Sequence, residues 1–175
     1  MIEYTLEITS YCPHECSYCS TNASLTGTHI SVEQVEQFLK ENEVKLGDRI
    51  NISGGEPVAH PKFWDILQLC KSITKDVWVY TNAFENIRYN TSVVKELNCE
   101  ANVCMIPGET IYVPKTANKV HLLQLVRQGR AQELFPANIQ LSSNAGNKAS
   151  CKKCNHLVLQ ADGQIVKSPC KKKYT

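Results

Sequence analysis

Three cysteines lie close together near the start of the sequence, Cys12, Cys16 and Cys19, within Cys-Pro-His-Glu-Cys-Ser-Tyr-Cys. Thiolates are the usual ligands of iron-sulfur clusters, and a cubane cluster with four irons takes four cysteines when every iron has a thiolate. A set of three therefore leaves one iron of such a cluster open. An open iron can bind a small molecule directly, so this segment predicts a cluster that takes part in chemistry and does not only carry electrons.

Zinc is the alternative for this segment, because His14 lies among the cysteines and a set of three cysteines and one histidine can complete a tetrahedral site. The spacing is tight for a zinc finger, and no second ligand pair follows at the usual distance. Zinc would also leave a second motif, Gly54-Gly55-Glu56-Pro57, without an explanation. The iron-sulfur interpretation is therefore the leading one.

The residues around the cysteines predict a strand before them and a helix after them. Residues 3–9 alternate between apolar and polar side chains, as a half-buried strand does. Ser31 and Gln34 have the spacing of a capping box, and apolar residues at helical spacing follow. The cysteine segment is therefore predicted to be the loop between the first strand and the first helix.

The same alternation continues along the chain. Further strands are predicted over residues 50–53, 77–80, 101–106 and 137–141. Helices are predicted from Pro61, around residues 93–97 and over residues 118–128, with Gly129 placed to end the last one. This pattern is typical of an α/β protein with a parallel sheet and crossover helices. At roughly 30 residues per unit, residues 1–147 hold about five units, too few for a closed eight-stranded barrel.

Two more unusual segments follow predicted strands directly. Gly54-Gly55-Glu56-Pro57 comes after residues 50–53, and Thr81-Asn82 comes after residues 77–80. Ligands in parallel α/β proteins bind at the edge where the carboxyl ends of the strands meet. We therefore expect the cysteine loop and both of these segments to lie along one edge of the sheet.

These motifs together resemble the radical S-adenosylmethionine (radical SAM) superfamily. Its signature is Cys-x3-Cys-x2-Cys after the first strand, with an aromatic residue before the last cysteine, and Cys12, Cys16, Tyr18 and Cys19 match it. Gly54-Gly55-Glu56-Pro57 matches its second-strand motif, and Thr81-Asn82-Ala83 is similar to its Thr-Asn-Gly. The resemblance is clear from residue 4 to about residue 82, and weak over residues 83–147.

The resemblance implies a partial, truncated parallel β/α barrel and a reaction. A 4Fe-4S cluster on the three cysteines would bind S-adenosylmethionine at its open iron and, with one electron from a donor such as flavodoxin or ferredoxin, cleave it to methionine and a 5′-deoxyadenosyl radical. That radical abstracts hydrogen from a substrate. Gly54 and Gly55 would leave room for close backbone approach, and Glu56 would favour the ammonium group of the cofactor. Tyr18 would lie near the adenine, and Asn82 would line the site.

Three more cysteines lie near the other end of the sequence, Cys151, Cys154 and Cys170. Asp162-Gly163 between them predicts a hairpin, and pairing Gln160 with Gln164 places Cys154 opposite Cys170. Three gathered thiols indicate a second metal site, either zinc or iron-sulfur, and the resemblance to auxiliary-cluster extensions of some radical SAM enzymes favours iron and sulfur. The sequence does not identify the fourth ligand. Cys99 or Cys104 could complete a cluster, His156 could complete a zinc site, or the fourth position could stay open for substrate.

The charge is unevenly distributed. The net charge is +2, but residues 148–175 hold seven lysines and one acidic residue. We therefore divide the chain into a radical SAM core over residues 1–147 and a cysteine- and lysine-rich hairpin over residues 148–175. The lysines either face an anionic macromolecule or form a solvated surface.

The leading function is thus a radical SAM enzyme that acts on a peptide, a protein or a nucleic-acid base. The alternative is a non-catalytic zinc-binding module with a basic tail that binds nucleic acid. No segment approaches the roughly 20 apolar residues of a membrane span, and the start does not have the pattern of a signal peptide. We expect a cytoplasmic protein without membrane contact.

Overall fold

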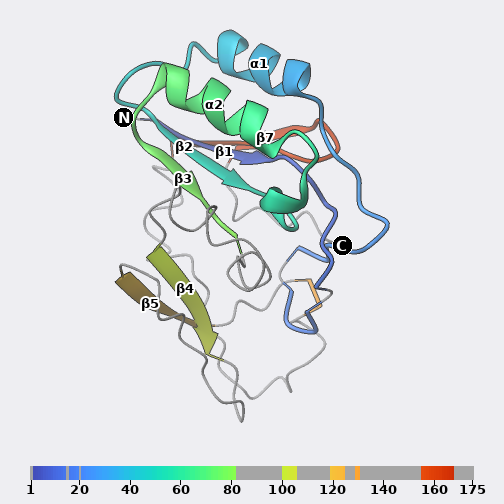
Figure 1. The fold of residues 1–175 in the computed structure, drawn as a ribbon. Coiled ribbons are helices and arrows are strands. Elements are labelled where there is room, and N and C mark those ends of the chain that lie inside the picture. Colours follow the sequence, from blue (N-terminus) through green and yellow to red (C-terminus); the bar gives the residue numbers. More distant parts are fainter. Residues whose placement is uncertain are drawn as a thin grey trace.

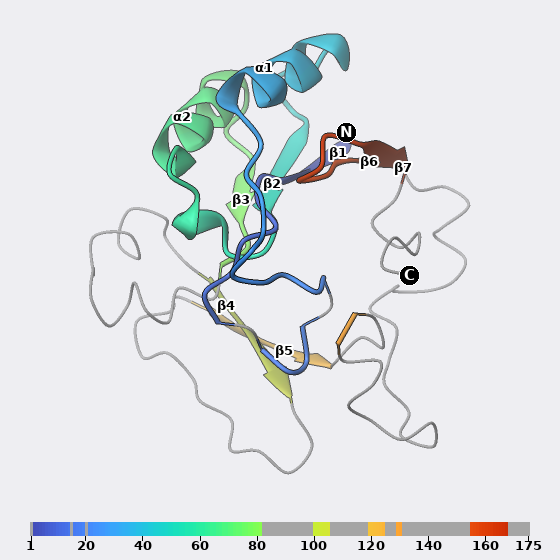
Figure 2. The same ribbon diagram turned by 90° about the vertical axis from the view of Figure 1, so that its right-hand side faces the viewer.

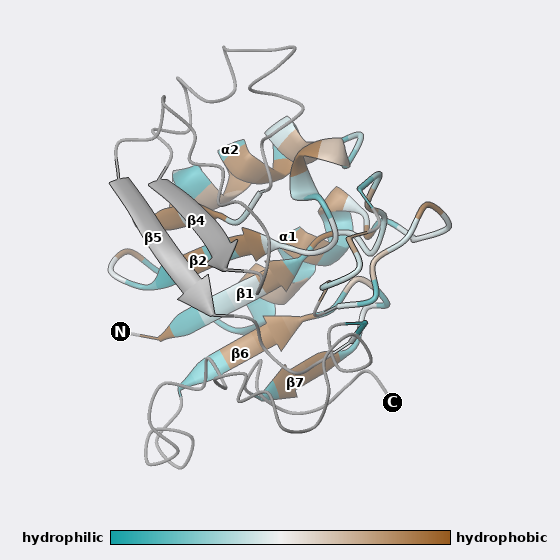
Figure 3. Cartoon of the chain, turned by 90° about the horizontal axis from the view of Figure 1, so that it is seen from below, coloured by the Kyte–Doolittle hydropathy of each residue, from teal (hydrophilic) through white to brown (hydrophobic). Residues whose placement is uncertain are grey.

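A five-stranded sheet forms the centre of the protein in a computed structural model that describes residues 2–14, 16–19, 21–81, 100–105, 119–124, 129–130 and 155–167. Its strands are β1 (Glu3–Glu7), β2 (Arg49–Ser53), β3 (Val77–Val79), β6 (His156–Leu159) and β7 (Ile165–Lys167). They are ordered β3-β2-β1-β6-β7, and Figure 3 shows β2, β1, β6 and β7 side by side. All neighbours are parallel except β6 and β7. The fold is therefore mixed α/β with a mostly parallel sheet, as the alternation of elements predicts.

Two helices cover one face of this sheet (Figure 1). They are α1 (Val32–Glu41) and α2 (Phe63–Ile73), and a short 3-10 helix, η1 (Pro57–Ala59), follows β2. The predicted capping box begins α1, because Ser31 Oγ accepts from the Gln34 backbone N–H at 3.2 Å and Gln34 Oε1 accepts from the Ser31 N–H at 2.8 Å. Pro61 does not begin α2 as predicted; it lies in a turn that His60 closes by accepting the Lys62 N–H on Nδ1 at 2.9 Å.

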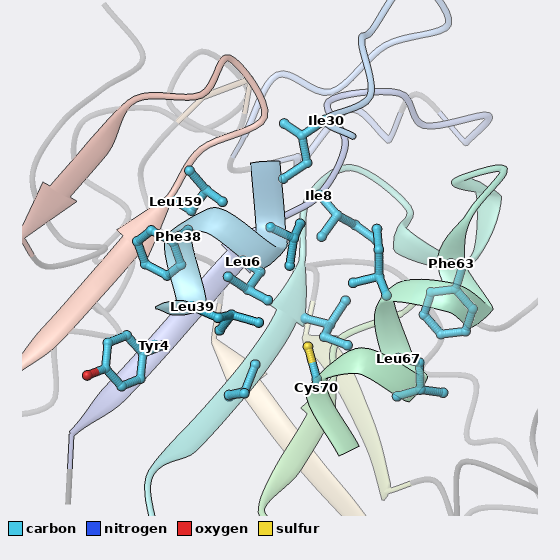
Figure 4. Packing of buried hydrophobic residues seen from close by; sticks show 14 residues of the cluster. Tyr4, Leu6, Ile8, Ile30, Phe38, Leu39, Phe63, Leu67, Cys70 and Leu159 are labelled. Atoms are coloured by element: carbon cyan, nitrogen blue, oxygen red, sulfur yellow. The ribbon is translucent and has the colours of Figure 1, made fainter. Parts of the chain in front are cut away.

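The hydrophobic core lies between the helices and the sheet (Figure 4). Alternate residues of β1 and β2 face it, and α1 and α2 contribute their apolar stripes. Its fully buried members include Leu6, Ile8, Ile50, Ile52, Phe63, Ile66 and Leu67. Cys70 also belongs to this core and is 0% exposed, so burial raises the pKa of its thiol to about 12. This agrees with its prediction as a small buried hydrophobe.

A second, two-stranded parallel sheet consists of β4 (Glu100–Met105) and β5 (Lys119–Gln124). The strand predicted over residues 101–106 is confirmed as β4. The helix predicted over residues 118–128 is wrong, because residues 119–124 form β5. A short apolar run fits a strand or a buried helix equally well by spacing, and here six residues of β4 supply the backbone partners for a strand. The helix predicted around residues 93–97 and the strand predicted over residues 137–141 lie outside the described residues.

The β6 strand lies beside β1, the strand that leads into the cysteine loop. Glu3 pairs with His156 and Leu6 with Leu159, in parallel. β6 then turns back into β7: the Gln160 N–H donates to the Gln164 carbonyl at 2.8 Å. Gly163 has a φ of 84°, which a glycine adopts without strain. Residues 156–167 thus extend the main sheet. The division between residues 147 and 148, and a metal-binding role for this hairpin, stay predictions.

Candidate functional site

The cysteine loop leaves the carboxyl end of β1 and returns to it before α1 (Figure 2). Its base is closed by backbone hydrogen bonds: Ser10 N–H donates to the Thr28 carbonyl at 2.9 Å, and Cys12 N–H to the Ser24 carbonyl at 3.0 Å. Thr9, which is fully buried, adds a bond from its hydroxyl to the Thr28 carbonyl at 2.9 Å. The loop is therefore anchored at both ends where parallel strands place ligands.

Cys12, Cys16 and Cys19 are partly exposed, and none of them is in a disulfide. Burial of the Cys19 thiol raises its pKa, but hydrogen bonds from Thr21 and from the Ala23 backbone, together with the charge of Arg130, outweigh this, so that its pKa lies below the ordinary value. Within the described residues, no three His, Cys, Asp or Glu side chains stand in a metal-binding arrangement. By residue type the loop supplies three thiols, one of them with a lowered pKa, and this donor set fits an iron-sulfur cluster.

The Gly-Gly-Glu motif runs alongside the first residues of the cysteine loop. The Gly55 N–H donates to the Thr9 carbonyl at 2.6 Å, and the Glu56 N–H to the Tyr11 carbonyl at 2.9 Å. A Cβ on Gly54 would overlap the Thr9 carbonyl oxygen, and one on Gly55 would overlap that of Tyr11. Gly54 also has a φ of 143°. The space that a side chain would need at Gly54 and Gly55 is therefore filled by the backbone of Thr9 and Tyr11.

Glu56 is 4% exposed and joins the ends of two strands. Its Oε1 accepts from the Val58 N–H at 3.1 Å, which caps η1, and from the Thr81 hydroxyl at 2.5 Å. Thr81 is the first residue of the Thr-Asn-Ala segment after β3. The structure thus brings the second and third predicted segments together through a buried carboxylate, an interaction that the sequence analysis did not foresee.

A hollow of about 120 Å³ lies at this edge of the sheet. Its lining comes from the ends of β1 and β2, from the cysteine loop and from the turn after β6, and it includes Glu7, Ser10, Thr21, Gly55, Gln160 and Asp162. Gln160 is 7% exposed and was predicted only as a position in the hairpin. Carboxylate, hydroxyl and amide groups suit a ligand that carries an ammonium group and hydroxyls.

The structure places some predicted residues and not others. Tyr18 lies in the cysteine loop and is half-buried. His156, the alternative zinc ligand, has its Nε2 2.6 Å from the Thr5 hydroxyl and its Nδ1 3.8 Å from Glu3. Cys104 lies in β4. Outside the described residues lie Asn82, Cys99, Cys151, Cys154 and Cys170.

Sequence reasoning missed Arg130, which contacts the cysteine loop through two backbone carbonyls, those of Cys16 and Ala23. It is separated from Cys16 by 114 positions, so no local pattern links the two. The nearest signal is Gly129, which is predicted to end a helix. In the structure Gly129 has a φ of 55° and forms a turn together with Arg130.

Comparisons with known proteins agree with these motifs. The Radical SAM superfamily model matches residues 6–98. PqqA peptide cyclases from Bradyrhizobium diazoefficiens and Rhodopseudomonas palustris are each 35% identical to this chain, over 79 and 80 residues, covering 44% of it and 20% of each relative. The chain thus spans about a fifth of the length of these curated relatives.

A solved structure of BtrN in complex with AdoMet and 2-DOIA has the same fold, with a TM-score of 0.60 at 16% identity over 95% of this chain and 72% of that one. An identity this low shows the fold alone. The family model, in contrast, spans more than half of the 175 residues and includes the cysteine loop and the Gly-Gly-Glu motif. The chain therefore belongs to the radical SAM superfamily, a superfamily of enzymes whose chemistry uses S-adenosylmethionine and an iron-sulfur cluster.

Proposed function

We propose that this protein reductively cleaves S-adenosylmethionine and uses the resulting 5′-deoxyadenosyl radical to abstract hydrogen from a peptide or protein. A 4Fe-4S cluster held by Cys12, Cys16 and Cys19 would supply the electron. The observation that carries the proposal is the shared edge of the sheet, where the cysteine loop, the Gly-Gly-Glu motif and the polar hollow meet.

The protein's own part in this reaction is to position the cofactor. Gly54 and Gly55 let the second strand approach the start of the cysteine loop, and backbone hydrogen bonds from Gly55 and Glu56 join the two motifs. Glu7 and Asp162 provide negative charge at the hollow, which favours the ammonium group of S-adenosylmethionine. Glu56 would favour the same group, as the family resemblance implies. Tyr18 would lie near the adenine and Asn82 would line the site, as the family resemblance implies.

A peptide substrate is favoured over a nucleic-acid base by the two matched relatives, which are named PqqA peptide cyclases. A truncated barrel, open on one side, would admit a segment of a larger molecule. The five-stranded sheet, with its mostly parallel order, supports such a partial barrel. The lysines of residues 148–175 would suit a peptide that carries acidic residues.

The test is purification without oxygen. The protein should be brown, contain iron and acid-labile sulfide, and release 5′-deoxyadenosine when it is reduced in the presence of S-adenosylmethionine, as measured by mass spectrometry. Colourless protein that contains only zinc would contradict the proposal. A mass change in a co-expressed peptide encoded beside this chain would identify the substrate.

We also propose a second iron-sulfur site on Cys151, Cys154 and Cys170. The antiparallel β6–β7 pair supports it, since Leu157 pairs with Lys167 in the register that the sequence predicts for this hairpin. Replacing Cys154 with alanine should lower the iron content per chain while leaving some cleavage of S-adenosylmethionine, because the first three cysteines stay intact. Iron and 5′-deoxyadenosine are measured on the same sample.

The matched control for this change is Cys70→Ala. Cys70 is a core residue with no access to solvent, so its replacement removes a thiol without removing a metal ligand. Iron content should then equal that of the wild type. A Cys154→Ala protein with the wild-type iron content would show that residues 148–175 hold no second cluster.

A further inference from the structure

Arg130 fastens the cysteine loop at two points. Its Nε donates to the Cys16 carbonyl and its Nη1 to the Ala23 carbonyl, each at 2.9 Å. The guanidinium is planar and its N–H groups point in fixed directions, so two such bonds fix the distance between the two carbonyls. The segment between them contains Cys19. One side chain thus sets the shape of the part of the loop that holds two of the three cysteines.

Other bonds in this segment depend on the same geometry. The Cys16 carbonyl also accepts the Cys19 N–H at 3.1 Å, which closes a turn between the two cysteines. Asn22 has a φ of 54°, a left-handed conformation that is unfavourable for most residues with a side chain and that Asn tolerates better than others. Hydrogen bonds on both sides of Asn22 keep the loop in this conformation.

The third nitrogen of the guanidinium has a different environment. Nη2 of Arg130 is buried and has no hydrogen-bond partner in the part of the chain that the structure describes. A buried charged N–H without an acceptor is costly, so an acceptor at this point would be strongly favoured. The same guanidinium lies close enough to Cys19 to act on its thiol electrostatically.

We propose that Arg130 is a positioning residue for the iron-sulfur cluster: it holds residues 16–23 in the binding conformation and provides positive charge and a buried N–H for the sulfur atoms. This inference rests on the proposed function. A cluster on three thiolates becomes more negative when it is reduced, and a nearby cation stabilises the more negative form. Arg130 therefore makes the cluster easier to reduce, which is the step that starts cleavage of S-adenosylmethionine.

Two substitutions separate the two parts of this role. Arg130→Lys keeps the charge but loses the rigid fork that joins two carbonyls, whereas Arg130→Gln loses both. Arg49→Gln is the matched control, because Arg49 pairs with Asp76 at 3.0 Å and lies over Trp78, at the amino end of β2. It removes the same charge from the opposite edge of the sheet.

The first measurement is backbone hydrogen exchange over residues 16–23, on protein stripped of iron and on protein purified without oxygen. Both Arg130 variants should exchange about tenfold faster than the wild type in this segment, because two charged hydrogen bonds are lost. The Arg49 variant should show wild-type exchange there. Wild-type exchange in Arg130→Lys would overturn the positioning role.

The second measurement is the reduction potential of the cluster, followed by electron paramagnetic resonance during a redox titration. Arg130→Gln should shift the reduction equilibrium about tenfold toward the oxidised form, or about 59 mV to more negative potential for one electron. Arg130→Lys and Arg49→Gln should stay near the wild type. An unchanged potential in Arg130→Gln would overturn the charge role.

The two proposals fail in different ways. If the wild type holds no cluster, the proposed function is wrong, and hydrogen exchange of the metal-free protein still tests whether Arg130 holds the loop. If the wild type holds a cluster and cleaves S-adenosylmethionine, but both Arg130 variants match it in exchange and in potential, only the inference about Arg130 is wrong.

Discussion

Protein in which Cys16 is replaced by alanine is expected to lose the iron of the first site and all detectable release of 5′-deoxyadenosine. A cluster on Cys12 and Cys19 alone would have two irons without a thiolate, and such a cluster is readily lost. Cys16 also lies at the centre of the loop, where its carbonyl accepts from both Cys19 and Arg130. These backbone bonds do not involve the thiol, so the fold should persist.

The control for this prediction is His14→Ala, which distinguishes the two metals considered for the loop. In an iron-sulfur site His14 is not a ligand, so iron content and 5′-deoxyadenosine release should be retained. In a zinc site with three cysteines and one histidine, His14 completes the tetrahedron, and its loss should weaken metal binding. Wild-type iron content in Cys16→Ala, or lost metal in His14→Ala, would contradict the assignment of Cys12, Cys16 and Cys19 as cluster ligands.

The Gly55→Ala protein is expected to be less stable by about 2–3 kcal/mol, because the added Cβ would overlap the Tyr11 carbonyl oxygen. That carbonyl accepts the Glu56 N–H at 2.9 Å, so the backbone cannot retreat without breaking the bond. For a protein of this size the melting temperature should fall by roughly 5–10 °C. Since Gly55 also lines the hollow, binding of S-adenosylmethionine should weaken in parallel.

Gly47→Ala is the comparison that isolates crowding from backbone strain. Gly47 has a φ of 96°, but a Cβ placed there meets nothing within 4 Å. Its replacement therefore carries only the strain of a left-handed residue, about 1 kcal/mol. Thermal unfolding of both variants measures the difference. Equal losses of stability in the two variants would mean that the overlap of a Cβ at residue 55 with the Tyr11 carbonyl costs no more than the backbone strain at residue 47.

Strands and a helix start that are set by residues close together in the sequence are predicted correctly. The alternation in residues 3–9 yields β1, and the capping box at Ser31 yields the start of α1, because burial periodicity and capping are local properties. The shared edge of the sheet also follows from local information, since each motif is placed directly after a strand. Local reasoning failed for residues 119–124, where the partner strand β4 decides the conformation.

The features that sequence reasoning missed are contacts between distant segments. Arg130 reaches the Cys16 carbonyl, and the Thr81 hydroxyl reaches Glu56, across many intervening residues. Gly54 and Gly55 take part in a further contact between distant segments. The sequence predicts that they leave room for close backbone approach, but it does not indicate which backbone segment approaches them. The structure shows that the Thr9 and Tyr11 backbone occupies this space.

The position of β6 beside β1 sets an order of events during synthesis. The Thr5 hydroxyl and the His156 ring, 2.6 Å apart, are separated by 151 positions along the chain. At about 5–20 residues per second, a ribosome needs roughly 8–30 s to bridge that interval. Until then β1 is an open edge, and the nascent cysteine loop borders a half-built hollow. The hollow, whose lining includes Gln160 and Asp162, is therefore complete only after translation has passed these residues.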